Sequence, residues 1–120
     1  MDSTDEKALR DINLRIPPAE DSGDKAFFEN LLGAGFGFRR PSGEILDKQG
    51  FLGIIGKGER ECHPHSIRIF PIGAHRALVT CVLRSRPKDG EPWKEFDNAR
   101  LFAKNAKGEW KLVGWANEPL

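Results

Sequence analysis

Two adjacent arginines, Arg39 and Arg40, stand directly before a Pro41-Ser42-Gly43 turn. Guanidinium groups bind carboxylates and phosphates through paired hydrogen bonds, so these two residues could form an anion-binding rim around an active site. They could equally do no more than flank a turn between a strand and a helix, because proline and glycine favour chain reversal. We therefore count Arg39 among the candidate ligand-binding residues and keep both interpretations.

Residues 93–104 carry polar and aromatic side chains on one face of an expected strand. Phe96, Asn98, Arg100 and Phe102 share that face, because successive side chains of a strand point to opposite sides. An arginine among aromatic rings could bind the carboxylate or phosphate of a small ligand, with Asn98 orienting it. Alternatively, Arg100 could pair with an internal acidic residue or extend over the outer face of the sheet. Arg100, Asn98 and Phe102 are the other candidate ligand-binding residues.

The stretch Cys62-His63-Pro64-His65 holds two histidines that would point to the same side of a strand. Two histidines are too few for a metal site, which needs a third and usually a fourth ligand, and Cys62 would face the opposite side. The sequence therefore predicts no metal site. His65 could instead act as a general base in a pocket, since an imidazole titrates near neutral pH.

Several classes of function lack support in the sequence. Net charge is +1 and the apolar runs are short, so neither nucleic acid nor a membrane is expected as a partner. Cys81 lies among apolar residues, as a small buried side chain does, and the glycines of residues 33–37 lack the strand and helix that a dinucleotide site needs. The acidic start of the chain, residues 1–6, lacks the pattern of a signal peptide. We expect a cytoplasmic protein with free thiols and no cofactor.

The first helix is expected to begin at Ser3, with Glu6 completing a capping box. Leu9, Ile12 and Ile16 then follow a helical spacing. Pro17-Pro18 is expected to end this helix, because proline lacks the backbone donor and its ring clashes with the preceding turn.

Two shorter helices should follow. Asp24 is a suitable N-cap for residues 25–32, with Gly33 at the end, and Asp47 is a suitable N-cap for residues 48–55, with Gly56 at the end. Between them, residues 35–39 are expected to form a short strand.

The second half of the chain reads as a series of antiparallel strands. The expected strands are residues 63–72, 75–86, 93–104 and 109–117, with turns at 73–74, 88–90 and 105–108. Helices followed by a strand meander predict one α+β domain over residues 1–120, with the helices packed on one face of the sheet. Trp110 and Trp115 differ in parity on the last strand, so one of them should face outward and mark an interface.

Four segments carry a resemblance to a known superfamily. The chain resembles the nuclear transport factor 2-like proteins, and within them the DUF4440 group, which is related in fold to ketosteroid isomerase and the SnoaL polyketide cyclases. The resemblance implies a cystatin-like cone, in which a strongly curved sheet surrounds a pocket, and a homodimer formed through the outer sheet face. The segments that carry it are residues 36–43, 46–52, 97–102 and 110–117.

The resemblance also bears on the reaction. The isomerases need a carboxylate base near the end of the first strand and a tyrosine in the oxyanion hole, whereas this chain has Arg39-Arg40 there and no tyrosine. An arginine cannot accept a proton at neutral pH, which argues against that reaction. Asp97 resembles the acid/base position of SnoaL-type cyclases, with a surface salt bridge as the alternative.

Two functions therefore remain open. The first is a small-molecule pocket protein. Its catalytic form would be an acid/base enzyme (isomerase, cyclase or dehydratase-like) acting on an apolar anionic metabolite, with Asp97 or His65 as proton carrier. The second is a non-catalytic dimeric scaffold or association module whose cone is filled by its own phenylalanines.

Overall fold

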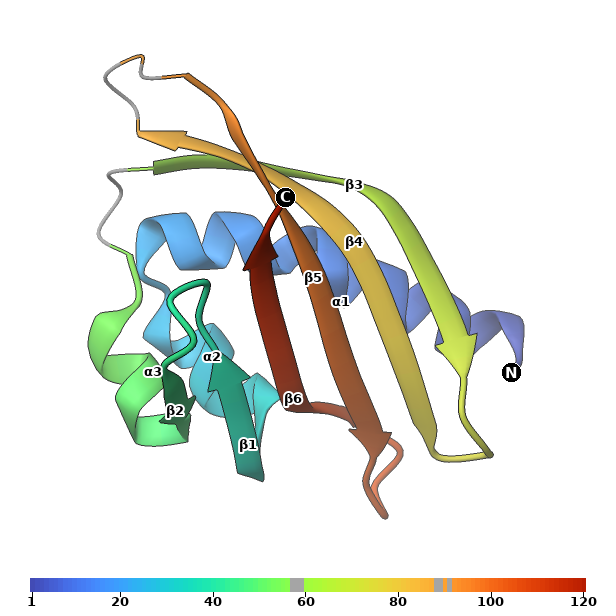
Figure 1. Cartoon of the computed structure of the whole chain (residues 1–120). Helices are drawn as coiled ribbons and strands as arrows, with labels where there is room; N and C mark the ends of the chain where they lie inside the picture. Colours follow the sequence, from blue (N-terminus) through green and yellow to red (C-terminus); the bar gives the residue numbers. More distant parts are fainter. Residues whose placement is uncertain (57–59, 88–89, 91) are drawn as a thin grey trace.

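The computed structural model describes residues 1–56, 60–87, 90 and 92–120. Three helices and a single six-stranded sheet form the fold (Figure 1). The elements are α1 (Ser3–Ser22), α2 (Lys25–Leu31), β1 (Leu32–Arg39), β2 (Ile45–Asp47), α3 (Lys48–Ile54), β3 (Arg60–Pro71), β4 (Arg76–Pro87), β5 (Lys94–Lys104) and β6 (Trp110–Pro119).

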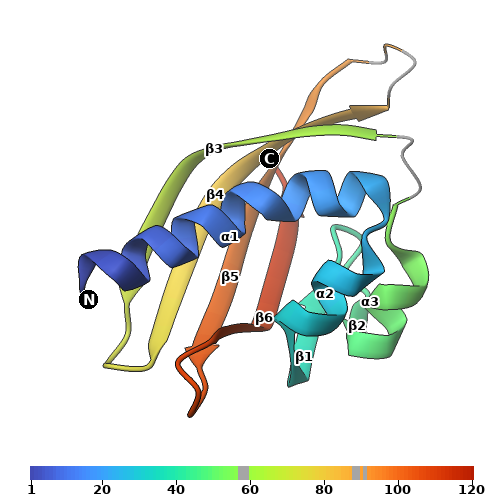
Figure 2. The same ribbon diagram turned by 180° about the vertical axis from the view of Figure 1, so that it is seen from behind.

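The strands are ordered β2-β1-β6-β5-β4-β3, and the sheet curves around α1. Figure 2 shows α1 lying across the strands on the inner face, with α2 and α3 grouped at one end. Strands β3 to β6 form the expected antiparallel meander, and β1 joins β6 as a parallel neighbour. The predicted α+β class with helices on one sheet face is confirmed. The short strand β2 was not predicted.

Helix α1 corrects the prediction at both ends. Its N-cap is Asp2, whose side chain accepts a hydrogen bond from the Asp5 backbone N–H, and not Ser3. The helix also continues through Pro17 and Pro18 to Ser22. Ile16 and Pro17 are buried under the sheet, so packing of the inner face offsets the two backbone hydrogen bonds that the prolines remove.

The starts of the other two helices are confirmed, but their predicted ends are not. Asp24 accepts from the Phe27 N–H and Asp47 from the Gly50 N–H, as expected of N-caps. The chain leaves α2 at Leu32, which is already extended and begins β1, so Gly33 does not end that helix. Helix α3 likewise ends in an extended cap residue, Ile55, one position before Gly56.

The strands begin and end within a few residues of the predicted bounds. Gly73 and Gly108 occupy the left-handed region that their turns require, with φ of 74° and 80°. Strand β3 starts at Arg60, three residues before the predicted bound. Most of the turn predicted at 88–90 lies outside the described residues.

Strand β6 overturns the prediction that one tryptophan faces outward. Trp110 and Trp115 are both buried, 7% and 4% exposed. Phe102 pairs with Leu112 whereas Leu101 pairs with Gly114, so β6 holds one extra residue at this point. This bulge reverses the alternation between the two tryptophans and turns both of them inward.

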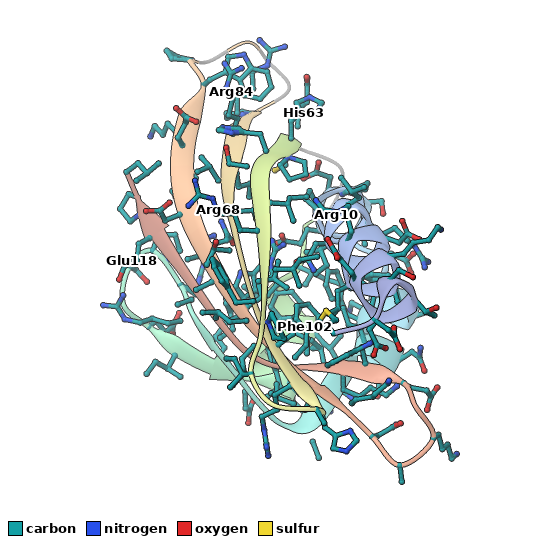
Figure 3. All side chains as sticks on the ribbon, turned by 90° about the vertical axis from the view of Figure 1, so that its right-hand side faces the viewer. Arg10, His63, Arg68, Arg84, Phe102 and Glu118 are labelled. Carbon is teal, nitrogen blue, oxygen red and sulfur yellow. The ribbon has the colours of Figure 1, made fainter. Side chains whose placement is uncertain are left out.

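Aromatic rings fill much of the interior. Phe51 makes edge-to-face contacts with Phe28, Phe36 and Phe38, and Phe38 also packs on Trp115. Phe102 lies between the sheet and α1, whereas Glu118 lies on the side that faces away from this helix (Figure 3). Among the described residues, no helix has the length and apolar character needed to cross a membrane.

Candidate functional site

A cavity of about 240 Å³ lies at the end of the cone where α1 and β6 both finish. Residues of α1, α3 and all strands other than β2 line its wall. The residues that line it are Glu20, Asp21, Phe38, Arg40, Pro41, Phe51, Ile54, Ile55, Gly56, Cys62, Leu83, Ser85, Phe96 and Asn117.

One wall of the cavity is apolar. Phe38 and Phe51 meet edge to face with their ring centroids 5.4 Å apart, and Leu83 and Phe96 are cross-strand neighbours on β4 and β5. Phe38 and Phe51 are almost fully buried, so their positions are set by core packing and not by the cavity. A rigid apolar wall of this kind suits the hydrocarbon part of a small ligand.

Two carboxylates from the end of α1 supply the opposite wall. Glu20 and Asp21 are both half-buried, and Asp21 Oδ2 accepts a hydrogen bond of 3.1 Å from the Cys62 backbone N–H. They reach the cavity only because α1 continues past Pro17 and Pro18. The carboxylates are therefore placed by the same packing that overrides the prolines.

Two glycines hold this end of α1 in place. Gly23 caps the helix in the left-handed conformation, with φ of 68°, and its backbone N–H donates back to the last turn. A side chain on Gly23 would collide with the carbonyl oxygen of Gly56, and one on Gly56 would lie 2.5 Å from the carbonyl oxygen of Glu20. The close approach of these backbones fixes the distance between α1 and the end of α3.

A thiol and a hydroxyl form the polar part of the strand wall. The Cys62 thiol donates to Ser85 Oγ at 3.4 Å. The pKa of Cys62 is raised to about 12, mainly by burial and in part by the neighbouring Asp21 and Glu20 carboxylates, against the lowering effect of the hydrogen bond with Ser85. The thiol is protonated at neutral pH and is not an activated nucleophile.

Asn117 and Arg40 complete the cavity wall. Asn117 Oδ1 is buried and accepts no hydrogen bond from the described part of the chain. Arg40 lies in the turn after β1, and its guanidinium donates to Glu44 at 2.8 Å. The wall thus contains a buried acceptor oxygen from β6 that has no partner among the described residues, and a cation that is paired with Glu44.

Arg100 is fully buried and does not line this cavity. Its guanidinium donates to Asn13 Oδ1 at 3.0 Å and to Asn98 Oδ1 at 3.5 Å, and its Cζ lies 4.6 Å from the centroid of the Trp115 ring. None of the ion pairs in the described part of the chain includes Arg100, and its Nε has no hydrogen-bond partner there. Burial lowers the pKa of Arg100, while the charge of Glu20 raises it.

The structure divides the candidate ligand-binding residues into two groups. Asn98, Arg100 and Phe102 all face the interior, but none of them lines the cavity. Arg39 is exposed at the end of β1 and pairs with Glu118 on β6 at 3.1 Å. This position agrees with the second interpretation of Arg39, as a residue that flanks the turn after β1.

The two candidate proton carriers lie on the outer face of the sheet. Asp97 is exposed, and its cross-strand neighbours are Val82 and Glu118. His65 is also exposed and contacts Glu95 at 2.9 Å. Their placement argues against a role for either side chain inside the cavity. The described residues contain no group of three or more side chains that could hold a metal ion.

Sequence reasoning missed Glu20, Asp21, Ser85 and Asn117. For Glu20 a signal was present in α1, where Leu9, Asn13, Ile16 and Glu20 follow one another at intervals of four, three and four residues. That spacing keeps side chains on a single helical face. The expected stop at Pro17-Pro18 concealed the continuation of the face to Glu20.

Comparison with known proteins identifies the fold. No family model matches the chain, and no curated protein matches it in sequence. An NTF2-like protein from Cytophaga hutchinsonii is 19% identical, with 100% of both chains covered and a TM-score of 0.80. A domain of unknown function with a cystatin-like fold from Nostoc punctiforme is 14% identical over 100% of this chain and 80% of that one, with a TM-score of 0.86. The S. rosetta CaMKII hub is 19% identical over 95% of each chain, with a TM-score of 0.79.

These similarities confirm the cone predicted from the resemblance. The chain has the NTF2-like, cystatin-like fold over its whole length. The solved structures include proteins of unknown function and association domains, so the fold by itself assigns no activity.

Proposed function

We propose that this protein binds a small, partly apolar molecule in the cavity at the open end of the cone. The observation that carries this proposal is the convergence of carboxylate, amide and hydroxyl groups on a cavity whose other wall is aromatic. Binding sites for small molecules usually combine an apolar surface with a few polar groups that orient the ligand.

The proposal modifies the role expected of Arg100 and Asn98. An anionic ligand was expected because Arg100 was placed in the pocket, but its guanidinium does not line the cavity and is engaged by Asn13 and Asn98. We propose that Arg100 and Asn98 act indirectly, by holding the core in place. Acid/base chemistry on the bound molecule, if it occurs, would use Glu20 or Asp21, because Asp97 and His65 face away.

A fragment screen followed by two-dimensional NMR tests this function. Fragments that bind should shift the backbone amide signals of Cys62, Ser85 and Asn117, while Thr80 on the outer face should remain unchanged. A screen that produced no binder, or binders that shifted only outer-face signals, would remove the cavity as the functional site.

A second candidate function is self-association through the outer face of the sheet. Phe70, Leu78 and Leu101 are successive cross-strand neighbours there, and the Phe70 side chain is 45% exposed. Similar solved structures include the C. elegans CaMKII association domain and the S. rosetta CaMKII hub. An apolar band on an exposed sheet face favours contact with a second copy, and we propose a homodimer, the form that the resemblance implied. A cytoplasmic location is likewise proposed, on the evidence of two free cysteines.

A further inference from the structure

We propose that Ser66, His65 and Glu95 form a nucleophile, base and acid triad on the outer face of the sheet, and that this triad hydrolyses small activated esters. This inference goes beyond the proposed function, because the triad shares no residue with the lining of the cavity. It gives His65 the role of general base that the sequence indicated, but on the opposite side of the sheet.

The imidazole of His65 is engaged at both of its ring nitrogens. Nδ1 lies 2.9 Å from Ser66 Oγ, and Nε2 lies 2.9 Å from Glu95 Oε2. A carboxylate only accepts hydrogen bonds, so the proton of the neutral imidazole is assigned to Nε2, and Nδ1 is left to accept from the Ser66 hydroxyl. An activated serine requires this arrangement, in which a base lies beside the hydroxyl and a third group orients the base.

A second histidine–glutamate pair on the same strand lacks the hydroxyl. His63 Nε2 lies 3.1 Å from Glu61 Oε1, and within the described part of the chain its Nδ1 makes no hydrogen bond. The His63 ring instead packs against Trp93, with the ring centroids 5.5 Å apart. The serine, and not the ion pair with a glutamate, therefore distinguishes His65.

The backbone at Ser66 is strained. Its φ is 57°, and among the described residues no other residue except glycine has a positive φ. Ser66 lies in a bulge, where two residues of β3 oppose one residue of β4. A glycine would adopt this conformation without cost, so the hydroxyl is what serine adds here. Strained residues and bulges are both enriched at functional sites, where they aim a side chain.

The sheet holds the three side chains in place and leaves them accessible. Ile67, the next residue of the bulge, packs against the core. His65 is the cross-strand neighbour of Val82, and Glu95 is that of Arg84, so the contact between His65 and Glu95 spans β4. The His65 and Glu95 side chains are 46% and 45% exposed. A small ester can therefore approach a triad whose geometry is fixed by regular strands.

Arg68 places a positive charge on the same face as the triad. It pairs with Thr80, which lies two residues from Val82 on β4, so the side chains of Arg68 and His65 point to the same side. None of the ion pairs in the part of the chain that the structure describes includes Arg68. A guanidinium favours the negative charge that develops on the oxygen of a reacting carbonyl.

The reaction proceeds in two balanced steps. In the first, Ser66 Oγ bonds to the carbonyl carbon of the ester, its proton moves to His65 Nδ1, and the alcohol leaves with that proton. In the second, water bonds to the acyl carbon and gives a proton to Nδ1, and Ser66 Oγ takes this proton back as the acid is released. Ester and water give acid and alcohol, and no other reactant is needed.

The ester p-nitrophenyl acetate tests the inference. The natural chain should release p-nitrophenol at least about tenfold faster than free imidazole at the same concentration, and mass spectrometry should find an acetyl group on Ser66. A fluorophosphonate, which loses fluoride to an activated serine and leaves a stable ester, should label the same residue. Both measurements are repeated on Phe70→Asp, so that self-association through the outer face does not cover the triad.

Variants of the triad give the second part of the test. Ser66→Gly should abolish the adduct and keep the fold, because glycine accommodates the positive φ. His65→Gln should slow ester hydrolysis about 100-fold. Glu95 is a positioning residue, so Glu95→Gln should lower kcat about tenfold and leave KM and the urea midpoint unchanged.

His63→Gln is the matched control, because His63 lies on the same strand and contacts a glutamate without a serine. It should leave ester hydrolysis unchanged. The triad is overturned if His63→Gln slows the reaction as much as His65→Gln, if Ser66→Gly keeps the natural rate, or if neither probe labels Ser66. None of these outcomes affects the cavity, which the fragment screen tests separately by the amide shifts of its own lining residues.

Discussion

Arg100 Nη1 donates a 3.0 Å hydrogen bond to Asn13 Oδ1 and so joins the middle of β5 to the middle of α1. Both side chains are fully buried, and Asn13 also donates to the carbonyl oxygen of Leu9, which holds its amide against the helix. Glu20 follows Asn13 by seven residues, or about two helical turns, on the same face. The Arg100–Asn13 bond therefore sets the rotation of α1 that brings Glu20 to the cavity.

Replacing Arg100 should destabilise the protein strongly. We expect Arg100→Met to lower the free energy of unfolding by about 2–4 kcal/mol, because it leaves the Asn13 oxygen buried without a donor, while Asn98 Oδ1 keeps only the hydrogen bond from the Trp115 indole. Urea denaturation measures the loss. In a double-mutant cycle with Asn13→Leu, the coupling should be about 1 kcal/mol or more, since the double variant removes both partners.

The control for this cycle is Arg10→Met on the exposed side of α1. Arg10 pairs with Glu6 at 3.6 Å and its side chain is 44% exposed, so the change should stay within about 0.5 kcal/mol. An Arg100→Met protein as stable as Arg10→Met would show that the buried hydrogen bonds do not hold α1.

The contact between Gly56 and α1 should tolerate no side chain. Gly56→Ala would place a Cβ 2.5 Å from the carbonyl oxygen of Glu20, so we expect a loss of about 1–3 kcal/mol and a shift in the amide signals of residues 20–23. Gly53→Ala is the matched control in α3, because its Cβ would meet no atom within 4 Å and alanine favours a helix. If both variants were equally stable, the close approach would not position the acidic wall.

Much of the fold was predictable from local patterns, and the failures share a physical cause. The N-caps Asp24 and Asp47, and the placement of Asn98 and Arg100 on one shared face, follow from spacing and residue type alone. The continuation of α1 through Pro17 does not, because it depends on burial against a sheet that forms from distant segments.

The candidate site suffered most from the same limitation. Glu20 was lost with the end of α1, and the bulge that turns Trp110 and Trp115 inward has no local signal in β6. Alternation placed Arg100 and Asn98 on one face of the strand but left open whether that face is the inner one, and the contact of Arg100 with Asn98 in place of the cavity depends on side-chain packing that alternation does not predict. Sequence patterns predicted which residues of β5 share a face, but they did not predict which face is inward or how deeply each residue lies.

Asp5 should make the stability depend on pH. It accepts hydrogen bonds from Lys104 at 3.0 Å and from the Trp110 indole at 3.0 Å, and the Lys104 bond, followed by the Trp110 bond, holds the pKa of Asp5 below its usual value. A lowered pKa stabilises the fold above the unfolded value of about 3.9, and this contribution is lost as pH falls through the folded pKa. The difference in urea midpoint between the natural chain and Asp5→Asn should therefore shrink as pH is lowered from about 6 towards the folded pKa.

The exposed pair Lys7–Asp11 provides the comparison for this pH profile. Asp11 is 55% exposed and pairs with Lys7 at 3.1 Å within one helical turn, so Asp11→Asn should give a small difference at every pH. A constant difference for Asp5→Asn across the acid range would mean that its carboxylate does not contribute through its charge.

Self-association through the outer face should depend on Phe70. We expect sedimentation at micromolar concentration to give the mass of a dimer, and Phe70→Asp to give that of a monomer, because a charge at the β3 end of the apolar band would be desolvated on association. Leu14→Asp is the matched control, since Leu14 is 49% exposed on α1 and Phe70 is 45% exposed on β3. A natural chain that sediments as a monomer, or a dimer that survives Phe70→Asp but not Leu14→Asp, would contradict the sheet face as the interface. The cavity lies on the opposite side of the sheet, so in either case its function would have to be explained from a single chain.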